Sequence, residues 1–316
     1  IIHRPGIEIE KMTPRTANNL LYDDILDLEL ASNEHDELTG ILKLHAEVYE
    51  MRDLLGDILR KVRVKEKLLQ NLIQRMNASP CLFKELSKLP AQELASLLFA
   101  GVPQKKDSLA KFLSNRVFAL PPLPNFIYTR DSAIVINEFA VIGSMANRIR
   151  ISESLIAEHI FSYHDNMLAQ DFYFDGTVED ESITVEGGDI LILREDVLAI
   201  GLSERTTPSA VDSLIKKFKA KGKIKHIFAV ILPKERAMIH LDMLFTMVDK
   251  NYAVVHKPYI LGENHLGVVH INLNENEDRF EYVPCLFKGL KELGIELEPV
   301  FCGGDDLLSQ EREQWM

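Results

Sequence analysis

The chain has 316 residues, of which 46% are hydrophobic and 27% charged, the proportions of a globular protein with a sizeable core. Its net charge of −12 argues against nucleic-acid binding, because phosphate recognition needs a basic surface. Three cysteines without close spacing fit a reducing cytoplasm better than a disulfide scaffold. No apolar run reaches the roughly 18 residues of a membrane span, so we expect a cytoplasmic protein of about two domains.

The pattern of apolar and polar residues changes twice along the chain. Residues 1–13 predict a short strand followed by a turn at Pro5 and Gly6. Residues 32–117 carry apolar side chains at helical spacing, which predicts an all-helical domain with those side chains in its core. From residue 118 short strands rich in Val, Ile and Phe alternate with helical patterns, which is typical of an α/β fold. The sequence therefore predicts an all-helical unit at residues 32–117 between an opening segment, residues 1–31, and an α/β part, residues 118–316.

From residue 118 onward an aspartate recurs at the edge of an apolar run about every 60 residues. The four positions are Asp131, Asp189, Asp242 and Asp305. Two of the segments, VEGGD and FCGGD, are near-copies of each other. Such a period indicates repeated supersecondary units arranged around a centre, to which each unit contributes polar residues. Coincidence is the alternative, and the repeated Gly-Gly-Asp disfavours it.

The common cofactor motifs are absent from the sequence. The chain contains no G-x-x-x-x-G-K-[ST], no G-x-G-x-x-G and no H-E-x-x-H. Its ten histidines show no Cys/His ligand spacing. We therefore expect neither a nucleotide cofactor nor a metal.

Acidic residues and one histidine do stand at the ends of predicted strands. His240 and Asp242 are two positions apart, so on a strand they would share a face. An imidazole beside a carboxylate suits general acid–base chemistry, although a buried histidine satisfied by its neighbours is the structural alternative. Glu186 precedes two glycines, which permit close backbone approach, and a turn carboxylate is its alternative. For Asp131 the alternative is a local salt bridge with Arg130.

Taken together, these groups suit a planar cation as ligand. A guanidinium group has five N–H donors and stays charged, so paired carboxylates can bind it bidentately. Arg150 and Arg205 would suit the carboxylate end of an amino-acid ligand. The residues themselves leave open whether either arginine is a ligand contact or an ordinary surface residue.

Several motifs, in order and along nearly the whole chain, resemble those of the arginine deiminases of the guanidine-modifying superfamily. They are His3-Arg4-Pro5-Gly6 with Glu8, Tyr22-Asp23-Asp24-Ile25, Pro122–Asn125, Tyr128–Asp131, Glu186–Asp189, Gly201–Thr206, His240–Asp242 with Phe245, and Cys302–Asp305 with Arg312–Trp315. One such motif would be a weak signal, whereas the ordered set is a strong one.

The resemblance implies a fold, an activity and a ligand. The fold is a five-bladed α/β propeller with pseudo-fivefold symmetry, its last blade missing from this chain, plus the inserted helical domain. The activity is hydrolysis of L-arginine to L-citrulline and ammonia, with no metal and no organic cofactor. The partner is a small-molecule substrate rather than a nucleic acid or a membrane, and assembly into a homo-oligomer is left open.

The resemblance also assigns roles by position. Glu186 would orient His240, while Asp131 and Asp242 would hold the guanidinium, and these four form the catalytic set. Asn125, Arg150 and Arg205 would contact the α-carboxylate end of the substrate. The full set of substrate-binding residues is Asn125, Asp131, Arg150, Asp189, Arg205 and Asp242.

The implied mechanism uses a cysteine thiolate that attacks the guanidinium carbon, with His240 as the acid and then the base. In the family this cysteine stands near the C-terminus, so we expect it beyond Met316. Cys81, Cys285 and Cys302 are expected to be small buried hydrophobic residues instead.

Two alternatives stay open at this point. The chain could be a non-catalytic relative that binds arginine or serves as an assembly subunit, without the nucleophile. It could also be another guanidine-modifying enzyme, such as an agmatine deiminase or an amidinotransferase, although these would not be expected to carry the helical domain.

Overall fold

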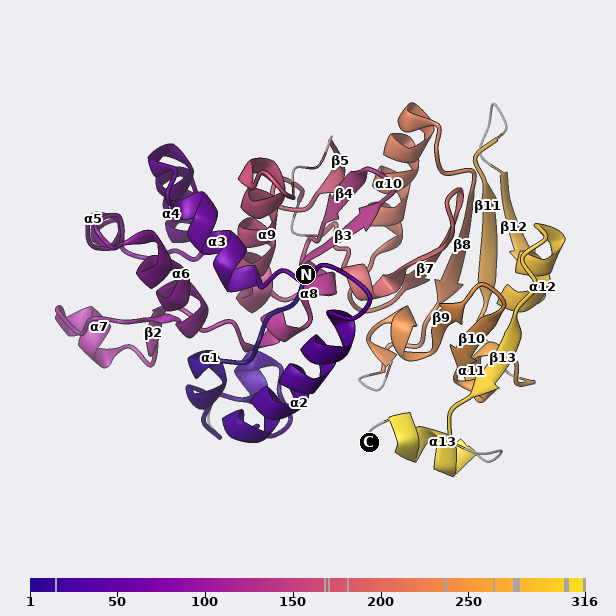
Figure 1. Ribbon diagram of the computed structural model, residues 1–316, viewed down its shortest axis with the longest axis horizontal. Coiled ribbons are helices and arrows are strands. Elements are labelled where there is room, and N and C mark those ends of the chain that lie inside the picture. The colour runs from indigo at the N-terminus through magenta and orange to yellow at the C-terminus, as the bar shows by residue number, and fades with distance from the viewer. Residues whose placement is uncertain are drawn as a thin grey trace. The chain divides into compact units, whose positions relative to one another are not determined.

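The computed structural model describes residues 1–14, 16–167, 169, 171–180, 182–235, 238–263, 265–274, 279–303 and 307–314 (Figure 1). The chain divides into two compact units. Unit 1 comprises Ile1–Ala133 with Asn147–Gln170, and unit 2 comprises Ile134–Ala146 with Asp171–Met316.

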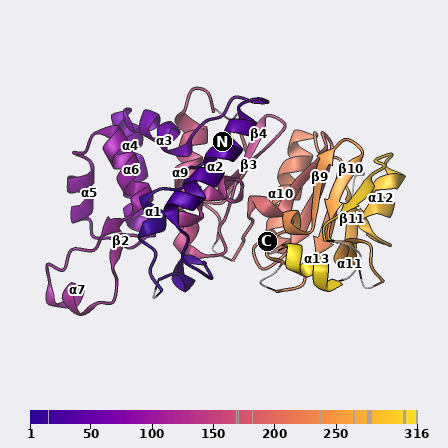
Figure 2. The same cartoon turned by 60° about the horizontal axis from the view of Figure 1, so that its bottom comes forward.

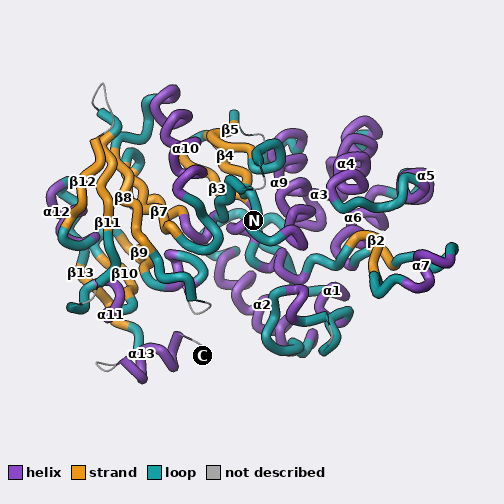
Figure 3. Tube along the Cα trace, turned by 180° about the vertical axis from the view of Figure 1, so that it is seen from behind, coloured by secondary structure: helices purple, strands orange, loops and turns teal. Residues whose placement is uncertain are grey.

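Unit 1 is built almost entirely from helices, shown in purple in Figure 3. Its α-helices are α1 (Ile7–Glu10), α2 (Leu28–Leu42), α3 (Met51–Leu59), α4 (Val62–Arg75), α5 (Cys81–Leu86), α6 (Ala91–Ala100), α7 (Leu109–Leu113), α8 (Thr129–Ser132) and α9 (Ile151–Tyr163). Three 3-10 turns accompany them: η1 (Asn18–Leu20), η2 (Pro124–Ile127) and η3 (Arg148–Arg150). A short antiparallel pair joins β1 (Val102–Pro103) to β2 (Phe118–Leu120).

The core of unit 1 lies where α3 packs against α4, α6 and α9. Leu55 and Leu68 are fully buried there, because apolar residues recur at helical spacing along each helix. Seen from the side in Figure 2, α3, α4 and α6 lie next to one another, while α7 stands on an extended loop. Helix α6 ends at Gly101, whose φ of +77° and close approach to Pro122 leave no room for a Cβ.

The described residues of unit 2 form three sheets, shown in orange in Figure 3. Its strands are β3 (Ala133–Ile136), β4 (Phe139–Ile142), β5 (Phe172–Asp175), β6 (Ile190–Arg194), β7 (Val197–Leu202), β8 (His226–Ile231), β9 (Phe245–Asp249), β10 (Tyr252–Val255), β11 (Val268–Asn272), β12 (Arg279–Val283) and β13 (Glu298–Phe301). Its helices are α10 (Pro208–Lys221), α11 (Lys257–Ile260), α12 (Leu286–Glu292) and α13 (Leu307–Gln314), with 3-10 turns η4 (Gly187–Asp189) and η6 (Leu241–Met243). The strand orders are β3-β4-β5, β12-β11-β8-β7-β6 and β13-β10-β9.

One pattern recurs in these sheets. The adjacent strands β6 and β7 pair antiparallel, α10 follows, and β8 returns parallel to β7. Likewise β9 and β10 pair antiparallel and β13 pairs parallel with β10, although α11, the strands β11 and β12 of the five-stranded sheet, and α12 come between β10 and β13. In the first sheet β4 and β5 are also a parallel pair. The chain therefore repeats a supersecondary unit of two strands, a helix and a parallel strand.

The aspartate period coincides with this structural repeat. Asp131 lies two residues before β3, Asp189 directly before β6, and Asp242 three residues before β9. Asp305 lies outside the described residues, as do Gly304 and Trp315 of the last two motifs. The three described aspartates therefore occupy equivalent places at the entry to successive sheets.

The α/β character expected from residue 118 onward is confirmed by the strands and helices of unit 2. The expected opening strand is wrong, because residues 1–13 contain only a single bridge from Ile2 to Glu50 and then helix α1. On this helix Ile9 is buried whereas Ile7 is exposed, so the apolar residues do not alternate along a sheet. Residues 32–117 are largely helical, yet the compact unit that contains them also includes residues 1–31, 118–133 and 147–170. Among the described residues, no helix has both the length and the apolarity to cross a membrane.

Candidate active site

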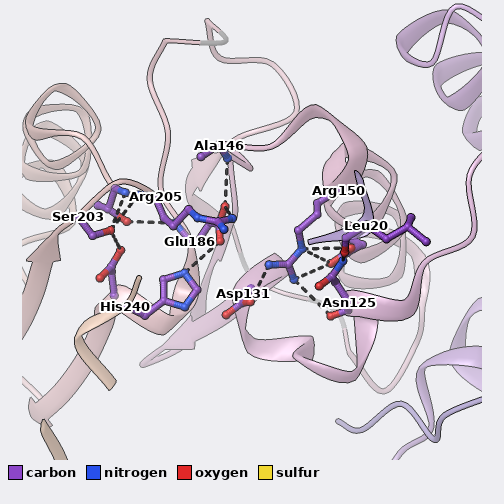
Figure 4. Close-up of polar contacts among 12 residues, drawn as sticks. Leu20, Asn125, Asp131, Ala146, Arg150, Glu186, Ser203, Arg205 and His240 are labelled. Carbon is purple, nitrogen blue, oxygen red and sulfur yellow. Dashed lines mark hydrogen bonds and ion pairs between the residues drawn. The ribbon is translucent and has the colours of Figure 1, made fainter. Parts of the chain in front are cut away.

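A buried ion-pair cluster lies in unit 1 around Arg150 (Figure 4). Its Nη1 donates to Asp131 Oδ2 at 2.8 Å, and its Nη2 donates to Glu153 Oε2 at 2.8 Å. Asp131, Arg150 and Glu153 are only 6%, 3% and 1% exposed. Two carboxylates thus face one guanidinium, so the three groups together carry a net negative charge that favours a further cation.

Local structure explains how these three side chains meet. Arg150 closes the turn η3, and Glu153 follows three residues later in the first turn of α9, so both side chains share one helix face. Asp131 lies in the short helix α8, which packs against α9. Burial and the charge of Asp131 raise the pKa of Tyr128, as expected near a concentration of negative charge.

Asn125 is also buried in unit 1, but its amide nitrogen is used internally. Its Nδ2 donates to the carbonyl of Leu20 at 2.7 Å, and its own carbonyl accepts a 3.3 Å hydrogen bond from Arg150. The Tyr22 hydroxyl donates to the carbonyl of Pro124 at 2.9 Å. The structure therefore joins two of the sequence motifs, Tyr22–Ile25 and Pro122–Asn125, to the Arg150 cluster.

In unit 2 the central contact joins Glu186 to His240 (Figure 4). The His240 Nε2 lies 3.0 Å from Glu186 Oε2, and the two residues are 5% and 0% exposed. The other oxygen of Glu186 accepts a 3.1 Å hydrogen bond from the backbone N–H of Ala146. Since an ionised carboxylate only accepts hydrogen bonds, this contact places a proton on Nε2 of the imidazole.

The second glycine after Glu186, Gly188, makes room for the imidazole. A Cβ on Gly188 would lie 2.5 Å from His240 Nδ1, closer than side-chain carbons approach other atoms. The close packing expected from the Glu-Gly-Gly sequence is therefore present, and it is directed at the histidine.

His240 and Asp242 do not lie on a strand, so that expectation is wrong. His240 has extended backbone but immediately precedes the 3-10 turn η6, which contains Leu241 and Asp242. A 3-10 turn does not alternate its side chains as a strand does, so the two residues are not held on a common face. Asp242 is half-buried and lines a cavity of about 260 Å³ together with Phe245, His256 and Cys302.

Arg205 stands beside the Glu186–His240 pair. Its Nη1 lies 3.5 Å from Glu186 Oε1, and its side chain is 12% exposed. Its backbone N–H donates to Ser203 Oγ at 2.9 Å, so a turn of the Gly201–Thr206 motif fixes the start of the side chain. Of the candidates in unit 2, Glu186, Arg205 and His240 are therefore brought together.

Asp189 is fully buried at the end of η4. Burial raises its pKa to about 6, although His240 and its hydrogen-bond donors act in the opposite direction. Its carboxylate accepts from Ser203 Oγ and from the backbone N–H of Leu241, so it is tied into the fold of unit 2.

The cysteines differ from their expected burial. Cys81 is exposed, and Cys285 and Cys302 are half-buried, so the expectation of three small buried hydrophobic residues is wrong. Cys81 opens the short helix α5 and Cys285 is the N-cap of α12, places where side chains face partly outward. Among the described residues of either unit taken alone, no three Cys, His, Asp or Glu side chains converge closely enough to hold a metal ion.

Sequence reasoning missed Glu153, Ser203 and Thr206. Glu153 could have been found, because it follows Arg150 by three residues, the spacing at which two side chains share one face of a helix. Ser203 and Thr206 carried no such signal, since their roles depend on contacts with residues far away in the sequence.

Fold and site define a mixed α/β protein with buried carboxylates paired to guanidinium groups and to an imidazole. The family model of arginine deiminase matches residues 18–316. The arginine deiminase of Bacillus cereus (strain B4264) is 32% identical over 336 residues, which cover 100% of this chain and 81% of the relative. The enzyme of the same name from Bacillus cytotoxicus is 33% identical over 334 residues, with the same coverage. The chain therefore belongs to the arginine deiminase family.

A solved structure of dimethylarginine dimethylaminohydrolase from Pseudomonas aeruginosa, complexed with citrulline, is similar at 18% identity. The match covers 68% of this chain and 90% of that chain, with a TM-score of 0.36.

Proposed function

We propose that this protein hydrolyses the guanidinium group of L-arginine to L-citrulline and ammonia. Membership of the arginine deiminase family supports this activity over agmatine deiminase, amidinotransferase or a non-catalytic relative. The observation that carries the chemistry is the 3.0 Å contact between buried Glu186 and His240.

Glu186 orients the imidazole and stabilises its protonated form. With Nε2–H held on the carboxylate, Nδ1 is the nitrogen that exchanges a proton with the substrate. A carboxylate beside a histidine favours the imidazolium, so His240 can act first as an acid and then as a base.

The reaction proceeds in two steps. A cysteine thiolate attacks the guanidinium carbon and forms a C–S bond, and the C–N bond breaks as His240 protonates the departing ammonia. His240 then removes a proton from water, which attacks the thiouronium carbon, and the C–S bond breaks to release citrulline and the thiolate. We assign the nucleophile to none of Cys81, Cys285 and Cys302.

Asp131 and Asp242 hold the substrate guanidinium in this proposal, and Asn125, Arg150 and Arg205 serve its α-carboxylate end. The net negative charge around Asp131 and the half-buried position of Asp242 beside a cavity support the first assignment. In the structure Arg150 forms ion pairs with Asp131 and Glu153. It can therefore bind the substrate carboxylate only if one of these ion pairs is replaced by a contact with the substrate.

We also propose that the repeated strand–strand–helix–strand units are blades of a five-bladed propeller, with residues 32–117 as an inserted helical domain. The regular placing of Asp131, Asp189 and Asp242 before the first strand of each sheet supports this arrangement. A cytoplasmic location and assembly into a homo-oligomer stay predictions.

The experiment is a citrulline assay on the native protein. Arginine should be converted and agmatine should not, because agmatine lacks the carboxylate that Arg150 and Arg205 would bind. His240→Ala should abolish turnover while arginine binding, measured by calorimetry, is retained. His45→Ala, a change at an exposed histidine of unit 1, is the matched control. Equal turnover of agmatine, or full activity of His240→Ala, would overturn the proposal.

A further inference from the structure

The carboxylate of Asp189 makes more hydrogen bonds to the site motifs than it would need in order to bind the substrate. Its Oδ2 accepts a 2.6 Å hydrogen bond from the Ser203 hydroxyl, and its Oδ1 accepts a 2.9 Å hydrogen bond from the backbone N–H of Leu241. The hydroxyl of Thr206 lowers the pKa of the same carboxylate, as a nearby donor does. Both oxygens are thus occupied by groups of unit 2.

These contacts connect three segments that are far apart in the sequence. Leu241 lies between His240 and Asp242 in the sequence. By accepting a hydrogen bond from the Leu241 N–H, Asp189 fixes the backbone next to both proposed site residues. Ser203 Oγ in turn accepts from the backbone N–H groups of Arg205 and Thr206. Thr206 Oγ1 accepts a 3.3 Å hydrogen bond from the backbone N–H of Glu186. A single carboxylate therefore sets the backbone on both sides of the Glu186–His240 contact.

Asp189 has no room to take another position. It is 0% exposed, and a Cβ on Gly201 would lie 2.3 Å from its Oδ1. Gly201 opens the motif that also contains Ser203 and Thr206, so this segment packs directly against the carboxylate. A buried carboxylate surrounded by donors is an anchor for the backbone, whereas a substrate ligand must keep an oxygen accessible.

We propose that Asp189 is a positioning residue, whose buried carboxylate fixes the Leu241 backbone and the Ser203–Thr206 turn so that His240 meets Glu186 in the reactive geometry. This inference rests on the proposed function and replaces the substrate-binding role that sequence resemblance assigned to Asp189. Asp189 acts through its neighbours and touches no reacting atom.

The test is Asp189→Asn in the native protein, with kcat and KM measured separately. An amide NH₂ cannot accept the Ser203 and Thr206 hydroxyl hydrogens, so the turn and the Leu241 backbone should shift. Proton transfer requires hydrogen-bond contact, so we expect kcat to fall at least about 30-fold while KM changes less than about 3-fold. Asp212→Asn, a change at an exposed carboxylate of α10, should leave both constants unchanged. A rise in KM of about tenfold or more with kcat retained would show that Asp189 binds the substrate and would overturn the proposal.

Two milder variants test the same network if Asp189→Asn fails to fold. Ser203→Ala and Thr206→Val each remove one donor and keep the carboxylate, so each should lower kcat several-fold with KM unchanged. The double variant Ser203→Ala with Thr206→Val should lose less than the product of the two single effects, because both changes act through Asp189. Full kcat in both single variants would contradict a positioning role.

A second readout separates this inference from the proposed function. The imidazole nitrogens of His240 can be followed by ¹⁵N-histidine NMR, with their signals assigned by comparison with His240→Ala. Ser203→Ala should move the His240 signals even if the wild-type protein forms no citrulline, in which case only the proposed function fails. Unmoved His240 signals in a citrulline-forming protein would overturn the role of Asp189 alone.

Discussion

Arg150 donates a 2.8 Å hydrogen bond to Asp131, and both side chains are almost fully buried. The guanidinium of Arg150 thus binds one oxygen of Asp131, the carboxylate that we propose as a ligand of the substrate guanidinium. Since Arg150 also pairs with Glu153, it can keep one partner while Asp131 accepts a new cation. The ion-pair cluster is therefore both a structural element of unit 1 and a model of the recognition that we propose.

Arg150→Met should destabilise the protein strongly. The change leaves Asp131 and Glu153 buried without their shared cation, and breaking a buried ion pair costs about 3–5 kcal/mol. Urea unfolding followed by circular dichroism measures the loss in the free energy of unfolding. Arg148→Met, at an exposed arginine two residues earlier, should change that free energy by less than about 0.5 kcal/mol. Equal stabilities of the two variants would show that the cluster is not a determinant of folding.

Gly188→Ala should impair catalysis more than folding. The added Cβ would meet His240 Nδ1 at 2.5 Å and displace the imidazole from Glu186. A displacement of about 1 Å at a catalytic group can lower kcat about 100-fold, and a citrulline assay measures it. Gly40→Ala is the control, because nothing lies within 4 Å of a Cβ at that exposed position of α2. Wild-type kcat in Gly188→Ala would mean that the imidazole does not need the space beside this glycine.

His3 should make the stability of unit 1 depend on pH. Burial lowers the pKa of His3, but hydrogen bonds to Glu50 and Glu8 outweigh it and leave that pKa raised. Burial raises the pKa of Glu8, and the contact with His3 outweighs it, so that pKa is lowered. The contribution of His3 is complete below its ordinary pKa of 6.5 and is lost as the pH rises through its folded value. The contribution of Glu8 is complete above its ordinary pKa of 4.5 and is lost as the pH falls through its folded value.

The free energy of unfolding should therefore differ most between wild type and His3→Gln at pH values between about 4.5 and 6.5. Chemical denaturation across the pH range measures that difference. His45→Gln, at an exposed histidine, should show no such window. A difference that stays constant from pH 4 to pH 9 would contradict the charged His3–Glu8 pair.

Asp189 should also make the free energy of unfolding fall as the pH rises, in the sense opposite to Glu8. Its pKa is raised to about 6 from an ordinary 3.8, so the folded state binds a proton more tightly than the unfolded state. Its ionisation therefore destabilises the fold as the pH rises from about 4 to about 6, by up to roughly 3 kcal/mol. In Asp189→Asn this pH-dependent loss should be absent, which unfolding curves at pH 4.5 and pH 7 can measure. Parallel pH profiles of variant and wild type would contradict the raised pKa.

Much of the chemistry was predictable from local sequence. Glu186, Gly188 and His240 could be proposed as site residues from the sequence. A purely structural role explains each of them alone, but it is a weaker explanation for a carboxylate, a glycine pair and a histidine together. The α/β texture and the helices of residues 32–117 followed from apolar periodicity, which is a local property. The strand expected at residues 1–13 and the one expected at His240 failed because short segments take their conformation from the tertiary packing around them.

The sequence by itself determined the kind of chemistry and the family, because the identities of the acidic, basic and imidazole residues and their order suffice for that. Only the tertiary structure decided which groups are partners: Arg150 with Asp131 and Glu153, Glu186 with His240, and Asp189 with Ser203 and Leu241. Most of these partners are separated by between 14 and 54 residues, and no local period specifies such pairs. They form because folding buries the carboxylates, and a buried carboxylate must find a hydrogen-bond donor or a cation wherever the chain brings one.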